Sequence, residues 1–215
     1  LYKMFVDFYY RTNINLWHEN AHHKLCVFAS SPMQFFGYDV GASLTDEEQI
    51  LHRFGICSCH AQRIPREPTL RIDQISNFPY LSVCTPSTQD MPHLAIWWRN
   101  QQADVQQFYH QVLKMEGAAP LQITPKIASA MINMHLEAKS MWCFLLFEDL
   151  FSLTDEFQKV QQLDDWLIQP STKGVKCGYR MHISLDKLLE KHEKWFQDIA
   201  QMVENSKRGR SANFR

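Results

Sequence analysis

Two polar stretches of the sequence carry acidic residues directly behind short apolar runs. Tyr38 and Asp39 lie in Gly-Tyr-Asp-Val-Gly, which follows Met-Gln-Phe-Phe. Gln89 and Asp90 end the polar stretch behind Tyr-Leu-Ser-Val-Cys. Aspartate carboxylates serve enzymes as nucleophiles, general acids or bases, and barrels of alternating strands and helices place such groups at the carboxyl ends of their strands. Both stretches are therefore candidate catalytic segments, although Asp90 taken alone would more commonly be a residue that caps the helix following it.

A third group of polar side chains, Cys57, Cys59 and His60, has the residue types of a metal site. A structural zinc site needs four ligands, and the sequence offers no fourth ligand at a recognisable spacing. The six cysteines are scattered through apolar stretches, and free cysteines are commonly buried as small hydrophobic residues. We therefore predict no metal or other cofactor, and a reduced, intracellular chain.

The composition indicates a packed domain. The 215 residues are 45% hydrophobic and 21% charged, which excludes disorder for the bulk of the chain. Lys and Arg number 22 against 23 Asp and Glu, so the net charge of −1 favours no nucleic-acid partner. No apolar run approaches the roughly 18 residues of a membrane-spanning helix, and the N-terminus lacks the pattern of a signal peptide. We expect a cytoplasmic chain that starts inside a larger protein.

Apolar and amphipathic segments alternate along the chain and predict strands that alternate with helices. Strands are expected over 34–37, 56–61, 81–85 and 142–146, and helices over 2–25, 45–54, 94–114, 125–138 and 184–206. Thr45 and Glu48 form a capping-box pattern, and Thr124 before Pro125 marks another helix start. Continuous apolar strands favour a parallel α/β sheet covered on both faces, in half of a βα barrel or a doubly wound sheet. The basic residues from about 205 to 215 are expected to form a frayed tail.

Five ordered stretches carry a family resemblance: NLWHENAHHKL, FGICSCHAQRIP, FPYLSVCTPSTQDMPHLAIWW, SMWCFLLFEDL and YRMHISLDKLL. They resemble the 4-alpha-glucanotransferases, the amylomaltases and disproportionating enzymes of glycoside hydrolase family 77. The resemblance implies that residues 1–215 form the C-terminal half of a TIM-type (β/α)8 barrel, with its N-terminal part elsewhere in the parent chain. It also implies an α-glucan or malto-oligosaccharide substrate, no cofactor, and neither a nucleic acid nor a membrane as partner.

The resemblance also implies roles for the two polar stretches. Family members are retaining enzymes, in which one carboxylate is the nucleophile and a second carboxyl is acid and then base. Asp90 stands at the position of the family's transition-state-stabilising aspartate, and Gln89 replaces a histidine but can still bond a sugar hydroxyl. Tyr38 stands where the family has its acid/base glutamate, with Asp39 beside it. The family's nucleophile lies on an earlier strand, before Leu1.

Tyr38 divides the possible functions. An unperturbed phenol has a pKa near about 10, and general acid/base catalysis contributes roughly a hundred- to ten-thousand-fold. An impaired glucanotransferase is therefore expected, and the alternative is an inactive glucan-binding or structural pseudoenzyme on the same barrel. A weaker third interpretation is an unrelated βα protein with coincidental motifs.

Two further sets of residues are interpreted as structural. Trp97 and Trp98 lie inside a predicted helix and are expected to be core aromatics rather than sugar platforms. The Arg-rich stretch RIPREPTLR and the Lys-Arg-Gly-Arg start of the tail are expected to be solvated charge.

Overall fold

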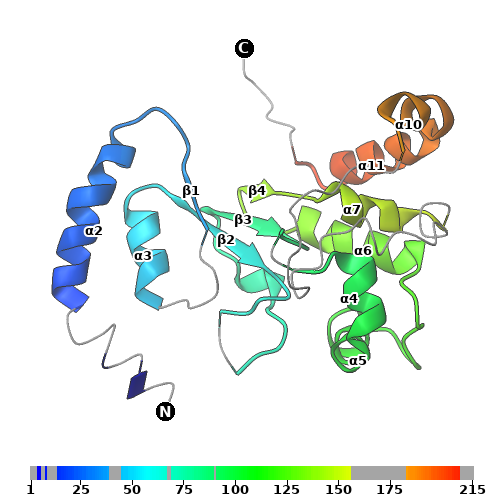
Figure 1. The fold of residues 1–215 in the computed structure, drawn as a ribbon, viewed down its shortest axis with the longest axis horizontal. Coiled ribbons are helices and arrows are strands. Elements are labelled where there is room, and N and C mark those ends of the chain that lie inside the picture. The colour runs from blue at the N-terminus through cyan, green and yellow to red at the C-terminus, as the bar shows by residue number, and fades with distance from the viewer. Residues whose placement is uncertain are drawn as a thin grey trace.

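A four-stranded parallel sheet organises the computed structural model, which describes residues 4–5, 8, 14–38, 45–66, 69–89, 91–155 and 183–208. The strands are β1 (Phe36–Gly37), β2 (Cys57–Ala61), β3 (Ser82–Thr85) and β4 (Trp142–Cys143). They pair side by side in sequence order, and every pair is parallel (Figure 1). The predicted strand positions, order and direction are confirmed, because buried parallel strands appear in the sequence as short continuous apolar runs.

The two faces of the sheet have different surroundings. Ser58 of β2 lies in register with Ser82 of β3, and helices cover the face of these residues. The opposite face carries the rings of Phe36, Trp142 and Phe144, and we name these three residues the open face because each is between 44% and 49% exposed. The ring centroid of Phe36 lies 6.0 Å from that of Trp142 and 5.7 Å from that of Phe144. Side chains perpendicular to the outer strands of a flat sheet would stand about 14 Å apart, so the sheet curls toward the open face, as in a barrel wall.

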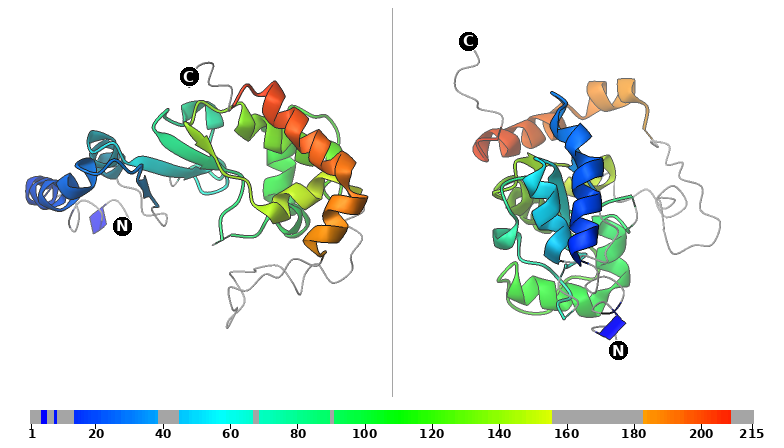
Figure 2. Two further views of the ribbon diagram at one scale, coloured as in Figure 1. Left: turned by 90° about the horizontal axis from the view of Figure 1, so that it is seen from above. Right: turned by 90° about the vertical axis from the view of Figure 1, so that its left-hand side faces the viewer.

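α-Helices lie between β1 and β2 and between β3 and β4, whereas a 3-10 turn lies between β2 and β3, and further helices precede β1 and follow β4. The helices are α2 (Ile14–Ala29), α3 (Thr45–Arg53), α4 (Leu94–Asn100), α5 (Gln102–Gln111), α6 (Pro125–Leu136), α7 (Phe147–Leu150), α10 (Leu185–Lys191) and α11 (Glu193–Asn205), with 3-10 turns η2 (Ile75–Asn77) and η3 (Phe151–Leu153). Figure 2 shows α2 and α3 at one end of the molecule, the sheet in the middle, and α4 to α7 with α11 at the other end. Among the described residues, no helix is long and apolar enough to cross a membrane.

Two predicted helices are each interrupted once. The helix expected over 94–114 breaks at Gln101, where the side chain of Gln102 donates to the carbonyl of Trp98 at 2.7 Å. The helix expected over 184–206 breaks at His192, and the indole of Trp195 just beyond the break donates to the carbonyl of Leu150 at 3.1 Å. The amphipathic periodicity of the sequence continues through both breaks, so the hydrophobic pattern alone did not locate them.

The start of α6 agrees with the sequence. The hydroxyl of Thr124 accepts the N–H of Ile127, and Pro125 occupies the first turn. Trp97 and Trp98 are buried in the main core, confirming their structural role. That core is formed by α4, α5, α6 and Ile123 before α6, and its buried residues are Leu94, Trp97, Trp98, Val105, Phe108, Ile123, Ile127, Ala128, Met131, Ile132 and Leu136.

The beginning of the basic tail is held against the fold. The guanidinium of Arg208 donates to the carbonyls of Leu136, Ala138 and Ser140 behind α6. A helix leaves its last carbonyls without intrahelical partners, and a cation there also complements the helix dipole. Arg208 is therefore not the solvated residue that the basic run suggested, and residues 209–215 lie outside the described part.

Candidate active site at the carboxyl ends of the strands

The two polar stretches singled out in the sequence meet in the structure. Tyr38 directly follows β1, and Thr88 lies in the loop behind β3. The hydroxyl of Tyr38 donates to the hydroxyl of Thr88 over 3.2 Å, although β2 separates the two strands. The contact places both stretches at the carboxyl end of the sheet, the location of catalytic residues in barrel enzymes.

Two of the four predicted site residues, Tyr38 and Gln89, lie in the described part of the chain. Tyr38 is 46% exposed and Gln89 is exposed, so both are open to solvent. Asp39 and Asp90 lie outside the described residues. Thr88, two positions before Asp90 in the sequence, is buried.

Arg63, which the sequence had suggested was solvated, instead anchors the loop over 86–94. Its guanidinium donates from Nε to the carbonyl of Pro86 at 3.0 Å and from Nη2 to the carbonyl of Pro92 at 2.8 Å. Nη2 also donates to the hydroxyl of Ser87. The guanidinium carbon lies 5.0 Å from the ring centroid of Trp97, a cation–π arrangement. Arg63 as a whole is partly exposed, but its Nη1 is buried.

Asp149 of α7 holds the same loop from the other side of β3. The carboxylate oxygen Oδ1 accepts the backbone N–H of Leu94 at 2.8 Å and the hydroxyl of Ser87 at 3.0 Å. Burial raises the pKa of Asp149 to about 6, against the opposing effects of Arg63 and these hydrogen bonds. Burial lowers the pKa of Arg63 to about 10, and Asp149 partly offsets that change.

Arg63 and Asp149 were not predicted as functional residues from the sequence. Asp149 lies in Phe-Leu-Leu-Phe-Glu-Asp-Leu-Phe, and a carboxylate in an apolar run was the available signal, because buried charges need partners. Nothing in the Arg-rich stretch distinguished Arg63 from its neighbours.

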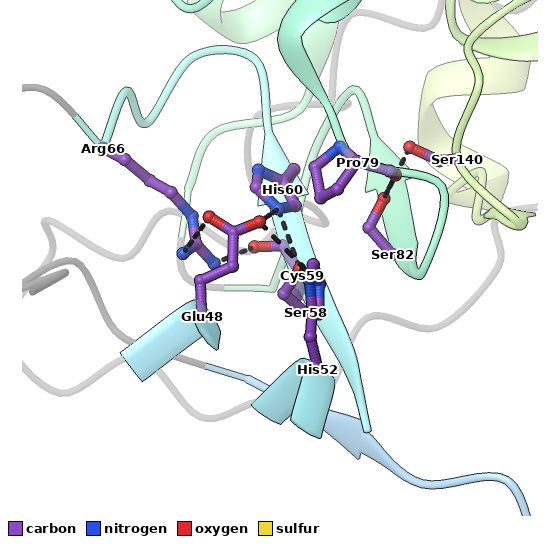
Figure 3. Close-up of polar contacts among 9 residues, drawn as sticks. All are labelled: Glu48, His52, Ser58, Cys59, His60, Arg66, Pro79, Ser82 and Ser140. Atoms are coloured by element: carbon purple, nitrogen blue, oxygen red, sulfur yellow. Dashed lines mark hydrogen bonds and ion pairs between the residues drawn. The ribbon is translucent and has the colours of Figure 1, made fainter. Parts of the chain in front are cut away.

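A second polar cluster lies on the helix-covered face, where α3 packs against β2 (Figure 3). The hydroxyl of Ser58 lies 2.9 Å from Nε2 of His60, and Glu48 Oε1 lies 3.4 Å from the same nitrogen. Both contacts use Nε2 of His60, whereas a catalytic hydroxyl–imidazole–carboxylate relay uses both ring nitrogens. Ser58 is also fully buried, so this cluster does not have the arrangement of a catalytic triad. Arg66 lies 3.4 Å from the other oxygen of Glu48. The hydrogen bond from His60 is the main cause of the lowered pKa of Glu48, so the cluster joins α3 to β2.

The cysteine and histidine group does not converge on one point. Side chains alternate along a strand, so Cys57 and Cys59 point to one face of β2 and His60 points to the other. In the described ranges no group of three or more His, Cys, Asp or Glu side chains could hold a metal ion.

Comparisons with known proteins identify the family of this chain. The sequence profile of the 4-alpha-glucanotransferases of glycoside hydrolase family 77 matches residues 1–184. The 4-alpha-glucanotransferase DPE2 of Oryza sativa subsp. japonica is 29% identical over 191 residues, which cover 88% of this chain and 20% of that protein. A 4-alpha-glucanotransferase of Chlamydia caviae is 32% identical over 84 residues, covering 38% of this chain and 16% of the relative. This chain therefore spans about a fifth of the length of the rice relative.

Solved structures show the same fold. An amylomaltase from Streptococcus agalactiae in complex with acarbose superposes with a TM-score of 0.54 at 14% identity, over 79% of this chain and 31% of that one. An amylomaltase from Corynebacterium glutamicum gives 0.52 at 11% identity, over 79% and 28%. The four parallel strands and their helices thus correspond to part of the TIM barrel of the amylomaltases. By the profile match over most of its length, the chain belongs to the 4-alpha-glucanotransferase family, glycoside hydrolase family 77.

Proposed function

We propose that this chain supplies one half of the active site of a 4-alpha-glucanotransferase that moves α-1,4-glucan segments between malto-oligosaccharides or glucans. The observation that carries the proposal is the hydrogen bond between Tyr38 and Thr88. It joins the acid/base position behind β1 to the stretch that carries Gln89 and Asp90. The remaining strands, with the nucleophile, would lie in the other part of the barrel.

The proposed mechanism gives each residue a separate task. The nucleophile of the other half would form a glycosyl-enzyme intermediate, which a sugar hydroxyl then attacks to give the transfer product. Asp90 would stabilise the positive charge of the oxocarbenium-like transition state, and Gln89 would bond a sugar hydroxyl. Tyr38 is the weak component, because a phenol with a pKa near about 10 is a poor proton donor to a glycosidic oxygen.

A pseudoenzyme that binds glucan without transferring it is the second candidate. The contact between Tyr38 and Thr88 favours it, because this contact engages the proton of Tyr38 at the position where the family places a carboxyl. An inactive protein could keep the barrel, the loop over 86–94 and a sugar site. The two candidates differ in turnover and not in binding.

The test uses the intact protein that contains these residues. It is incubated with maltotriose, and formation of glucose together with longer oligosaccharides is followed over time. Acarbose, the ligand of the Streptococcus agalactiae structure, is titrated in parallel by calorimetry. Slow transfer with acarbose binding supports the impaired enzyme, and binding without transfer supports the pseudoenzyme. The absence of both transfer and acarbose binding would contradict both candidates.

A further inference from the structure

We propose that Arg63 and Asp149 are positioning residues that clamp the loop over 86–94 from both sides of β3, with the hydroxyl of Ser87 between their charges. The inference rests on the proposed function in one respect, namely that Gln89 and Asp90 of this loop face a glucan. The clamp itself is carried by the contacts of the described residues.

The contacts lie at both ends of the loop. Arg63, which follows β2, bonds the carbonyls of Pro86 and Pro92. Asp149, which follows β4, accepts the N–H of Leu94. These are charge-assisted hydrogen bonds, which are roughly twice as strong as neutral ones. The loop is therefore fixed by groups from the strands on either side of its own.

Ser87 connects the two charges. Its hydroxyl accepts from Nη2 of Arg63 and donates to Oδ1 of Asp149. Thr88, the next residue, accepts a hydrogen bond from the hydroxyl of Tyr38, which follows β1. A shift of Ser87 would thus move Thr88 and the neighbouring Gln89, so the clamp controls the sugar-facing part of the loop.

The clamp is poorly suited to a purely stabilising role. Nη1 of Arg63 and Oδ2 of Asp149 are buried and make no hydrogen bond, and unsatisfied buried polar groups reduce stability. The two charges meet through the hydroxyl of Ser87, and well-packed apolar residues in place of such buried charges are often neutral or stabilising. What the ionic arrangement adds is a defined position for the loop.

The experiment compares Arg63→Lys, Asp149→Asn and Ser87→Ala in the intact protein. Lysine keeps the charge of Arg63 but lacks the planar fork that reaches several acceptors, and alanine removes only the bridging hydroxyl. The surface ion pair of Arg71 and Asp104, with Arg71 65% exposed on its side chain, supplies the matched controls Arg71→Lys and Asp104→Asn.

Two measurements distinguish failure of the clamp from failure of the proposed function. Amide hydrogen exchange over 86–94, measured without sugar, should accelerate about tenfold or more in the clamp variants, the effect of roughly 1.4 kcal/mol of lost anchoring, and should not change in the controls. The kcat for maltotriose transfer should fall about tenfold while KM changes less than twofold, and Asp149→Asn should not lower the unfolding midpoint.

Unchanged exchange in Arg63→Lys and Asp149→Asn would overturn the clamp, whatever the transfer assay gives. Accelerated exchange with wild-type kcat and acarbose affinity would overturn its role in the sugar site. If the wild-type protein neither transfers nor binds glucan, the proposed function fails, and accelerated exchange still supports the clamp. If Arg63→Lys does not fold, Ser87→Ala provides the same comparison.

Discussion

Neutralising Asp149 should stabilise the protein at neutral pH. The pKa of this carboxyl is raised from 3.8 to about 6, because burial disfavours its charge more than Arg63 and the hydrogen bonds favour it, and Glu148 adds a small repulsion. A folded-state pKa above the unfolded value means that ionisation is harder in the folded protein. Stability is therefore lost as the pH rises from about 4 to about 6, and the loss is constant above that range.

The magnitude follows from the size of the shift. About 2 pKa units at roughly 1.4 kcal/mol each give a penalty of about 3 kcal/mol above pH 6. Asp149→Asn removes this penalty and keeps an oxygen that can accept from Leu94 and Ser87. The pKa of about 6 already includes the attraction to Arg63, so we expect a net gain of up to about 3 kcal/mol at pH 7.5.

Urea unfolding of the intact protein between pH 4 and 8 measures this effect, with Asp104→Asn as the surface control. Titration of other groups affects the wild type and the variant alike and cancels in the difference. The gain should vanish near pH 4, where the carboxyl of Asp149 is protonated in the folded state. A variant less stable than the wild type at pH 7.5 would refute the reasoning, because it would show that pairing with Arg63 outweighs desolvation.

Three other predictions concern packing and assembly. Glu48→Gln should lower stability by about 1 kcal/mol at pH 7, because the lowered pKa of Glu48 contributes stability above its unfolded value of 4.5; urea unfolding should show the difference disappear as the pH falls through the folded-state pKa. Gly37→Ala should cost about 1 kcal/mol or less in the same assay, since a Cβ there would lie 2.9 Å from Leu51 Cδ1, the end of a side chain that can shift. The isolated segment should self-associate in sedimentation, because the rings of its open face are 44% to 49% exposed and β1 and β4 are the edge strands of the described sheet; a monodisperse monomer would contradict this.

Local sequence patterns predicted the sheet and the starts of α3, α4, α6 and α10. Strand order followed from apolar runs that alternate with helices, and Thr124 with Pro125 located the start of α6 because capping depends on adjacent residues. The breaks at Gln101 and His192 depend on tertiary contacts of Gln102 and Trp195. Such contacts have no local sequence signature.

The candidate site was predictable only in part. The carboxyl ends of β1 and β3 were expected at one edge of the sheet, and the contact between Tyr38 and Thr88 confirms this. The burial of Arg63 was not predictable, because Ser87 and Asp149 of its network lie 24 and 86 positions away in the sequence and charge alone favours a solvated position. Long-range pairing of charges required the fold.

Tyr38 carries the central claim, which is that this chain holds the acid/base position of a glucanotransferase without its carboxyl. The direct test measures maltotriose transfer by the intact protein and by Tyr38→Glu, with Tyr38→Phe as the control that loses only the hydroxyl bonded to Thr88. A carboxyl at this position should supply the missing proton transfer.

We predict slow transfer by the wild type, a rise of about a hundredfold or more in Tyr38→Glu, and no rise in Tyr38→Phe. Asp90→Asn in the Tyr38→Glu background should abolish the gain. An ordinary transferase rate in the wild type, or an unchanged rate in Tyr38→Glu, would contradict the account and show that another residue handles the proton.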